Sequence, residues 1–393
     1  MPYAAALSDA ADARKALADV CDSAIAALGR RPDLACVFLS PHHAGEGELI
    51  AATLEDRLGT ANVVGCMGES IVGTAREVEQ RPAMSLWLAE FSGAVEVEPF
   101  HLNPDEGREG PTLFGWPDAL IDCDPARATL LTLADPHTFP VTELFFPRVH
   151  VEYPGMPVVG GMSSGAMAPG QTVLIRGREA LYSGAVGVLL RGDRRCRSVV
   201  SQGCRPIGRP LVVTKGHENV VEEVGGRQPL EYLKGLYDEL PAADQQLFQK
   251  GLHIGLAMSE TREGFGRGDF LVRNLFGIDR ESGALVVTDR VRVGQTVQFQ
   301  LRDADTAADD LRELLRADRA ANGPAGGALL FTCNGRGMRM FQRPDHDATV
   351  IADEIGPVPT AGFFAAGELG PVGGTNFIHG FTASVVLFDE QPA

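Results

Sequence analysis

The chain has 393 residues, a formal net charge of −17, 44% hydrophobic residues and 22% charged residues. At roughly 150 residues per domain, this length predicts two or three globular domains with sizeable cores. The acidic balance disfavours partners such as nucleic acid or an anionic membrane surface. No apolar run approaches the roughly 20 residues that span a bilayer. Because the N-terminal segment carries acids where a signal peptide needs basic residues, we expect a cytoplasmic protein.

The cysteines and histidines indicate no cofactor or metal site. Seven cysteines are scattered along the chain without a C-x-x-C pair, which fits a reducing compartment and small buried side chains. The pair His42-His43 and the cluster Asp345-His346-Asp347 lack the spacing of known zinc or calcium motifs. We therefore expect neither a metal nor a bound cofactor.

Three helices are predicted in chain order. The first covers residues 8–29, with Ser8 as its cap and Gly29 as its stop. The second covers residues 229–249 and the third residues 306–320, because leucines recur there at helical spacing. Between the last two, residues 285–303 alternate apolar and polar side chains, which is typical of antiparallel strands.

An internal repeat is the most informative pattern. The strings "CVFLSPHH" and "LTLADPHT", and likewise "VVGCMGES" and "VVGGMSSG", are related by one offset of 95 positions (136 − 41 for the prolines, 160 − 65 for the glycines). A third copy opens at "ALLFTCNGRG" and continues at "VPTAGFFAAGE". A fixed period indicates a duplicated strand–helix–strand unit.

These elements predict the α/β class, as a two-lobed module with mixed sheets and internally duplicated strand–helix–strand units. We expect an N-terminal helix within residues 1–32, a first domain over 33–228 and a second over 229–388. Ligands of such folds gather at loops beyond the strand ends. The glycine turns of the repeats and the turn at Cys333 are therefore candidate ligand-binding loops.

Two motifs invite an enzymatic interpretation. "FTCNGRG" lacks the length and the lysine of a phosphate loop. "GMSSG" matches the G-x-S-x-G nucleophile elbow, and a serine hydrolase that uses Ser163 is the alternative function. However, Pro169 follows too soon for the helix that an elbow needs, and Gly68 stands where the repeat places Ser163. We expect a protein that is not an enzyme and has no catalytic residues.

Several strings together resemble the FIST family, named for F-box and intracellular signal transduction proteins. They are "VVGCMGESIVGTAREVEQRPAMSLWLA", "PVVGGMSSG", "SQGCRPIG", "QFQLRD", "FTCNGRG" and "GFFAAGELGPVGGTNFIHGFTASVVLF". The resemblance implies a FIST N-terminal domain followed by a FIST C-terminal domain, a pairing regarded as a sensory module for small ligands, amino acids among them. No F-box, kinase or cyclase region accompanies them, so the resemblance implies a stand-alone module that signals through a protein partner.

The resemblance and the glycine turns together predict reversible binding of a small zwitterion or anion where the two lobes meet. Arg336 and Arg302 are expected to hold a carboxylate, with Asp303 holding Arg302, while Glu368 receives an ammonium group. Glycine backbone N–H groups approach the ligand closely. The complete predicted set is Gly65, Cys66, Gly160, Gly161, Arg302, Asp303, Cys333, Asn334, Arg336, Glu368, Asn376 and His379. A ligand-independent interaction scaffold is the other alternative.

Overall fold

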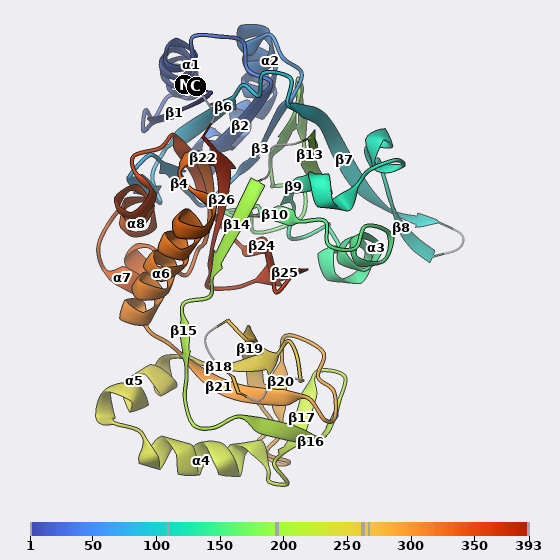
Figure 1. Ribbon diagram of the computed structural model, residues 1–393, viewed down its shortest axis with the longest axis vertical. Coiled ribbons are helices and arrows are strands. Elements are labelled where there is room, and N and C mark those ends of the chain that lie inside the picture. Colours follow the sequence, from blue (N-terminus) through green and yellow to red (C-terminus); the bar gives the residue numbers. More distant parts are fainter. Residues whose placement is uncertain (1, 108–109, 193–195, 261–263, 266–267, 391–393) are drawn as a thin grey trace. The chain divides into compact units, whose positions relative to one another are not determined.

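The computed structural model describes residues 2–107, 110–192, 196–260, 264–265 and 268–390, which form two compact units (Figure 1). Unit 1 consists of residues 1–201 and 311–393, and unit 2 of residues 202–310. Mixed sheets and helices confirm the α/β class. Unit 2 lies between two segments of unit 1 in the sequence, so these units divide the chain differently from the expected sequence domains over 33–228 and 229–388.

Unit 1 contains three copies of a strand–helix–strand arrangement. In the first copy, β2 (Leu34–Leu39) is followed by η1 (Pro41–Glu46), α2 (Gly47–Leu58) and β3 (Val63–Met67). In the second, β9 (Ala128–Ala134) is followed by η4 (Val141–Phe145), α3 (Phe146–Glu152) and β10 (Val158–Met162). In the third, β22 (Ala325–Cys333) is followed by α7 (Met338–Phe341), α8 (His346–Ile355) and β23 (Thr360–Ala365). The two strands of each copy are parallel, which confirms the duplication and the third copy.

Each parallel pair is extended on one side by two further strands, and each added strand is antiparallel to its neighbour. The inner ones are β6 (Met84–Ala89), β13 (Ala185–Gly192) and β26 (Ala383–Asp389), which pair with β2, β9 and β22 respectively. The outer ones are β1 (Tyr3–Ser8), β7 (Val95–Gly107) and β14 (Cys196–Ser201). The three copies therefore build three sheets with the same strand order.

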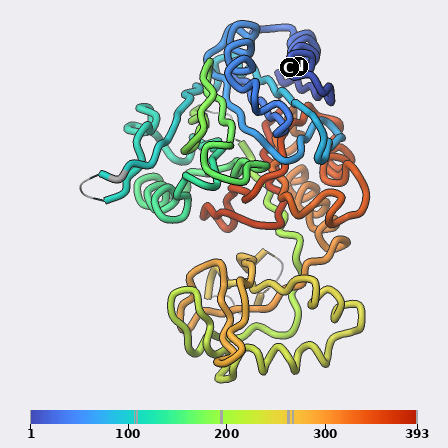
Figure 2. The backbone as a smooth tube through the Cα atoms, turned by 180° about the vertical axis from the view of Figure 1, so that it is seen from behind, coloured from blue at the N-terminus to red at the C-terminus, as the bar shows by residue number. Residues whose placement is uncertain are grey.

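A hairpin follows each parallel pair but joins the sheet of another copy. The hairpin of β4 (Ser70–Gly73) and β5 (Arg76–Glu79) follows β3, yet β4 pairs with β23. The hairpin of β11 (Leu174–Arg176) and β12 (Glu179–Leu181) follows β10, yet β11 pairs with β3. The hairpin of β24 (Gly367–Val372) and β25 (Thr375–His379) follows β23, yet β24 pairs with β10. The copies exchange hairpins in a cycle, and blue, green and red parts of the chain meet in unit 1 (Figure 2).

The central core of unit 1 lies among the three sheets. Apolar side chains from every copy form one buried cluster there, including Phe38, Leu133 and Phe331. The strands are nearly continuous apolar runs because both of their faces are covered. On the outer face of the first sheet, α1 (Ala13–Leu28) and α2 pack with buried residues such as Leu17 and Leu54.

Unit 2 is a small barrel. Its strands are β15 (Cys204–Pro206), β16 (Leu211–His217), β17 (Val220–Val224), β18 (Leu252–Ala257), β19 (Phe270–Ile278), β20 (Leu285–Val287) and β21 (Thr296–Arg302). The pairing of β21 with β18 closes the sheet. Two helices, α4 (Pro229–Glu239) and α5 (Ala242–Lys250), accompany it, and α6 (Ala304–Asn322) follows in the chain.

The predicted helices are present, with two corrections. Ser8 ends β1 instead of capping a helix, and α1 is capped by Asp12, whose carboxylate accepts from the Lys15 N–H at 2.8 Å. The helix expected over 229–249 is two helices, because Pro241 interrupts it. The strands expected within 285–303 are β20 and β21.

Candidate functional site

The strand glycines of the repeat serve backbone packing. Gly65, Gly160 and Gly362 occupy equivalent positions in β3, β10 and β23, opposite residues of β2, β9 and β22. A Cβ atom there would lie 2.2, 1.9 and 1.8 Å from the carbonyl oxygen of the opposing residue. Glycine is needed because the neighbouring backbone approaches so closely. The close backbone contact by itself explains the glycines at positions 65 and 160, and their expected role in ligand binding stays a prediction.

Cys66 is also a core residue. It is completely buried in the central cluster. Burial raises the pKa of its thiol well above the ordinary value, with the neighbouring Cys36 adding to the effect. A neutral, enclosed thiol has no role in contacting a ligand from solvent.

The three strand-end turns do converge. Met67 at the end of β3 accepts a hydrogen bond from the Ser164 N–H at 3.2 Å, and Met162 at the end of β10 accepts one from the Ala366 N–H at 3.0 Å. The third link runs through the Ser164 hydroxyl, which accepts from the Glu69 N–H at 2.7 Å and donates to the Phe364 carbonyl. Direct hydrogen bonds thus hold the three turns against one another.

Ser163 is enclosed at this meeting point. It is fully buried, and its hydroxyl donates to the Met67 carbonyl at 2.6 Å. A nucleophile needs an exposed hydroxyl and an adjacent base. The "GMSSG" turn therefore holds strand ends together, and the geometry does not favour the hydrolase alternative.

Arg336 is committed to a buried ion pair. Its side chain is 0% exposed, and it donates to both carboxylate oxygens of Asp347, from Nε at 2.7 Å and from Nη2 at 2.8 Å. Although burial by itself would raise it, the Arg336 guanidinium holds the pKa of Asp347 well below its usual range. The Thr332 hydroxyl also donates to Asp347 Oδ2 at 2.6 Å, and His346 Nδ1 lies 2.8 Å from Asp347 Oδ1. Arg336 is thus unavailable as the carboxylate anchor that we expected.

Glu368 is a buried carboxyl like Asp347, but its pKa is raised instead of lowered. Its side chain on β24 is 0% exposed, and Oε2 accepts from the Thr382 N–H at 3.1 Å and hydroxyl at 2.7 Å. Its second oxygen, Oε1, is buried and receives no N–H or O–H donor from the described residues, and the weak S–H donor of Cys333 lies beside the carboxyl. Burial raises the pKa of Glu368 to about 8, despite the hydrogen bonds from Thr382 and Cys333. The raised pKa favours the neutral form of this carboxyl at neutral pH.

The other two copies show that the fold does not need this carboxyl. Glu368 pairs with Gly161, and the equivalent hairpin residues opposite Cys66 and Phe363 are Leu174 and Ile71. Both are apolar members of the central cluster. Only the third copy places a polar group here, where burial costs free energy unless it is fully hydrogen-bonded. An unfavourable group in an otherwise apolar position indicates function rather than folding.

Cys333 and His379 lie beside Glu368, and Asn334 is the chain neighbour of Cys333. Cys333 ends β22, and its thiol is a hydrogen-bonding neighbour of the carboxyl, with burial and Glu368 raising the pKa of the thiol to about 12. His379 pairs with Glu368 across the β24–β25 hairpin, and its Nε2 lies 3.0 Å from the Gly370 carbonyl. Asn334 follows Cys333, and its Oδ1 is buried without a hydrogen-bond partner among the residues described. The predicted residues found in this part of the structure are thus Gly161, Cys333, Asn334, Glu368 and His379.

The remaining predicted residues have structural roles. Asn376 joins β25 to β10, accepting from the Val158 N–H and donating to the Met156 carbonyl, both at 2.8 Å. Arg302 and Asp303 belong to unit 2, whereas the rest of the predicted set belongs to unit 1. Asp303 accepts from the Arg205 guanidinium at 3.0 Å and also from the Asp305 N–H.

Sequence reasoning missed Asp347 and Thr382, which decide the roles of Arg336 and Glu368. Both stand next to predicted residues in folded space but 11 and 14 positions away in the chain. The sequence shows an acidic cluster around His346, but its spacing does not identify Arg336 as the partner of Asp347. Over the ranges given above, no group of three metal-binding side chains is arranged to hold an ion.

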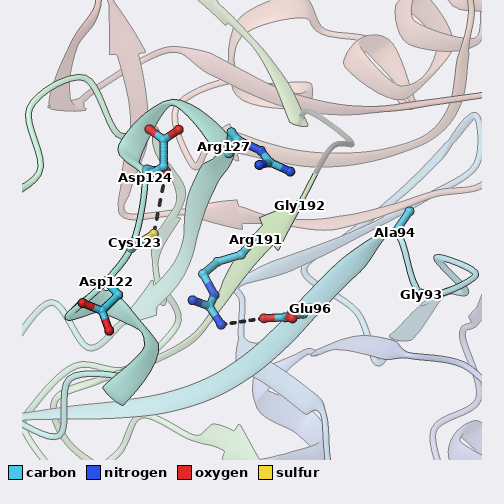
Figure 3. A pocket seen from close by; sticks show the side chains of 9 residues that line it. All are labelled: Gly93, Ala94, Glu96, Asp122, Cys123, Asp124, Arg127, Arg191 and Gly192. Carbon is cyan, nitrogen blue, oxygen red and sulfur yellow. Dashed lines mark hydrogen bonds and ion pairs between the residues drawn. The ribbon is translucent and has the colours of Figure 1, made fainter.

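A separate open cavity of about 390 Å³ lies at the opposite ends of the strands of the second copy (Figure 3). Glu96 and Arg191 line it as an ion pair, and Asp122, Cys123, Asp124 and Arg127 come from the segment before β9. In this copy η2 (Asp118–Leu120) and η3 (Pro125–Arg127) stand where the first copy has the helix α1. The cavity has a size suited to small molecules, but its carboxylates and guanidinium groups are largely exposed or paired.

Comparison with known families settles the wider assignment. The FIST N domain model matches residues 33–227 and the FIST C domain model matches residues 229–371. The chain belongs to the FIST family. FIST domains are associated with sensory roles in signal transduction. The Gly161–Glu368 pairing therefore joins a strand of the FIST N segment to a strand of the FIST C segment within unit 1.

Two mycobacterial proteins are similar to this chain over nearly its whole length. The uncharacterized protein Rv0628c of Mycobacterium tuberculosis is 43% identical over 386 residues, covering 97% of this chain and 98% of the relative. The uncharacterized protein Mb0898c of Mycobacterium bovis is 41% identical over 384 residues, covering 97% of each. Among the described residues, no helix is both long and apolar enough to pass through a bilayer.

Proposed function

We propose that this FIST chain is a cytoplasmic sensory module that reversibly binds a small ligand, with amino acids among the candidates, and signals through a protein partner. The binding site is the group around Glu368, with Cys333, Asn334 and His379. It lies where the FIST N and FIST C segments meet in β10 and β24. The module performs no catalysis and needs no cofactor.

One observation carries this proposal. Glu368 is a fully buried carboxyl whose Oε1 receives no N–H or O–H donor from the described residues, at a position that is Ile71 or Leu174 in the sibling copies. Leaving a buried polar atom unsatisfied costs about 1–3 kcal/mol. A ligand that supplies the missing hydrogen bond recovers this free energy on binding, so the site favours the bound state.

Arg336 has a positioning role in this proposal. Its ion pair with Asp347 fixes the turn that carries Cys333 and Asn334, and its Nη1 lies 3.5 Å from the Phe381 carbonyl, next to Thr382. The pair orders the residues that surround Glu368 without contacting the ligand. The turn at Asn334 and Gly335 is partly exposed.

A thermal-shift screen of metabolites on the full chain tests the proposal. A ligand at a hundred times its dissociation constant stabilises the folded state by about 2.7 kcal/mol. We expect at least one compound to raise the melting temperature of the wild type but not of Glu368→Gln. Glu77→Gln is the matched control, because Glu77 is also a buried carboxyl, and burial raises its pKa to about 8. Equal stabilisation of all three proteins would exclude Glu368 from the site.

A further inference from the structure

The turn after β22 carries an asparagine followed by a glycine. Asn334 and Gly335 are the central residues of a β-turn, which the Arg336 N–H closes by donating to the Cys333 carbonyl at 2.8 Å. Both central residues are partly exposed. In such a dipeptide the glycine nitrogen can attack the side-chain amide of the asparagine, because no Cβ atom obstructs the approach. The turn therefore holds the two reactants of a succinimide-forming step next to each other.

The main chain of Asn334 is held in place, whereas its side-chain oxygen is not. The Asn334 N–H donates to the Ala365 carbonyl at 3.0 Å, and the Asn334 carbonyl accepts from Arg339 Nη1 at 2.9 Å. The side-chain Oδ1 has no hydrogen-bond partner in the described part of the chain. Turning the side-chain amide toward the Gly335 nitrogen therefore breaks no hydrogen bond at this oxygen.

The same dipeptide occurs at a second place in the chain, where the structure restrains it. Asn322 is the last residue of α6, and Gly323 follows it. Asn322 Nδ2 donates to Asp318 Oδ1 at 2.8 Å, and the Gly323 N–H donates to the Arg319 carbonyl at 2.9 Å. Attack at this site would break both hydrogen bonds. The two sites contain the same reactants and differ in restraint, so Asn322 is the matched reference for Asn334.

We propose that Asn334 is a site of spontaneous deamidation through a succinimide. The Gly335 nitrogen forms a bond to Cγ of Asn334, the Cγ–Nδ2 bond breaks, and the proton of the Gly335 N–H leaves with Nδ2 as ammonia. Water then opens the imide ring at one of its carbonyl carbons. Opening at Cγ gives aspartate, and opening at the main-chain carbonyl carbon gives isoaspartate. No electrons are transferred, and water is the co-reactant.

Both products place a carboxylate beside a guanidinium that links two copies of the repeat. Besides the Asn334 carbonyl, Arg339 contacts Glu69, to which its Nη2 donates at 2.5 Å. Glu69 lies just before β4, in the first copy, whereas Arg339 lies on α7 of the third. A carboxylate on residue 334 would compete with Glu69 for Arg339 and weaken this link. The proposed modification goes beyond the proposed function and does not rest on it.

A single tryptic peptide tests the proposal, because residues 320–336 contain both Asn-Gly pairs and lie between the cleavage sites at Arg319 and Arg336. The folded full chain is incubated at pH 8 and digested, and fragmentation in a mass spectrometer locates the mass increase of deamidation. We expect Asn334 to deamidate several times faster than Asn322 and to give isoaspartate as well as aspartate. In urea the two rates should become similar. Gly335→Ala should suppress deamidation at Asn334 and leave Asn322 unchanged.

Four results would overturn the proposal. They are deamidation of Asn322 at least as fast as that of Asn334 in the folded chain, an Asn334 that stays intact there while it reacts in urea, aspartate without isoaspartate, and an unchanged Asn334 rate in Gly335→Ala. If Gly335→Ala disturbs the fold, the Asn322 rate in the same peptide rises toward its value in urea, and the wild-type comparison decides. None of these outcomes bears on ligand binding at Glu368, so the proposed function is tested separately.

Discussion

Replacing Glu368 by glutamine should change how the stability of unit 1 depends on pH. Glutamine keeps the size of the side chain and an oxygen that accepts from Thr382, but it cannot titrate. Burial raises the pKa of Glu368 from its ordinary 4.5 to about 8 in the folded protein. Between these values the folded state holds a proton that the unfolded state has released, so the wild type loses stability as pH rises.

The expected magnitude follows from this proton difference. One proton corresponds to about 1.36 kcal/mol for each pH unit. Between pH 5.5 and pH 7.5 the folded carboxyl stays mostly protonated and the unfolded one mostly ionised, so the wild type loses roughly 2–3 kcal/mol that Glu368→Gln retains. Below pH 4.5 both states are protonated and the difference vanishes.

Urea unfolding followed by tryptophan fluorescence measures this difference. Trp87 and Trp116 are the two tryptophans of the chain, and both belong to unit 1. The signal therefore reports the unit that contains Glu368. If the difference in unfolding free energy between wild type and Glu368→Gln is the same at pH 5.5 and pH 7.5, Glu368 is not a buried neutral carboxyl. The reasoning behind the proposed site then fails.

Three further predictions concern the surroundings of the site. Asp347→Ala should lower the unfolding free energy of unit 1 by about 3–5 kcal/mol in urea, because it leaves Arg336 buried and unpaired. Glu152→Ala, in the exposed pair with Arg148, should lower it by less than about 1 kcal/mol. Similar losses in the two variants would show that the Arg336 pair is solvated. Gly160→Ala, whose new Cβ would lie 1.9 Å from the Thr132 oxygen, should cost about 1–3 kcal/mol or more, while Gly45→Ala, with open space around it, should be nearly neutral. In the native protein an aromatic disulfide reagent should modify the partly exposed Cys123 and Cys204 faster than Cys196, because burial raises the pKa of the Cys196 thiol to about 12, and rapid modification of Cys333 would contradict its burial.

The repeat was predictable from the sequence because strand ends impose the same residues each time. Gly65 and Gly160 recur at one offset since each faces a close backbone carbonyl. The hairpin exchange was not predictable. The string around Ile71 specifies a strand, but nothing in its alternation identifies β23 as its partner rather than β3.

The candidate site was predictable only in part. Family strings led to Cys333, Asn334, Glu368 and His379, which the structure brings together. They also led to Arg336, whose role depends on Asp347, a residue on the next helix. An exposed arginine and a buried, paired one have the same local sequence, so spacing does not distinguish an anchor for a ligand from a structural ion pair.

The cyclic hairpin exchange has a consequence for the order of events during synthesis. Val72 pairs with Gly362, so β4 leaves the ribosome long before its partner strand exists. The early hairpin waits with unsatisfied backbone groups until translation is nearly finished, a state that invites pairing with neighbouring chains. Unit 1 should therefore become resistant to protease only late on the ribosome, and a fragment released after residue 228 should depend on chaperones to remain dispersed.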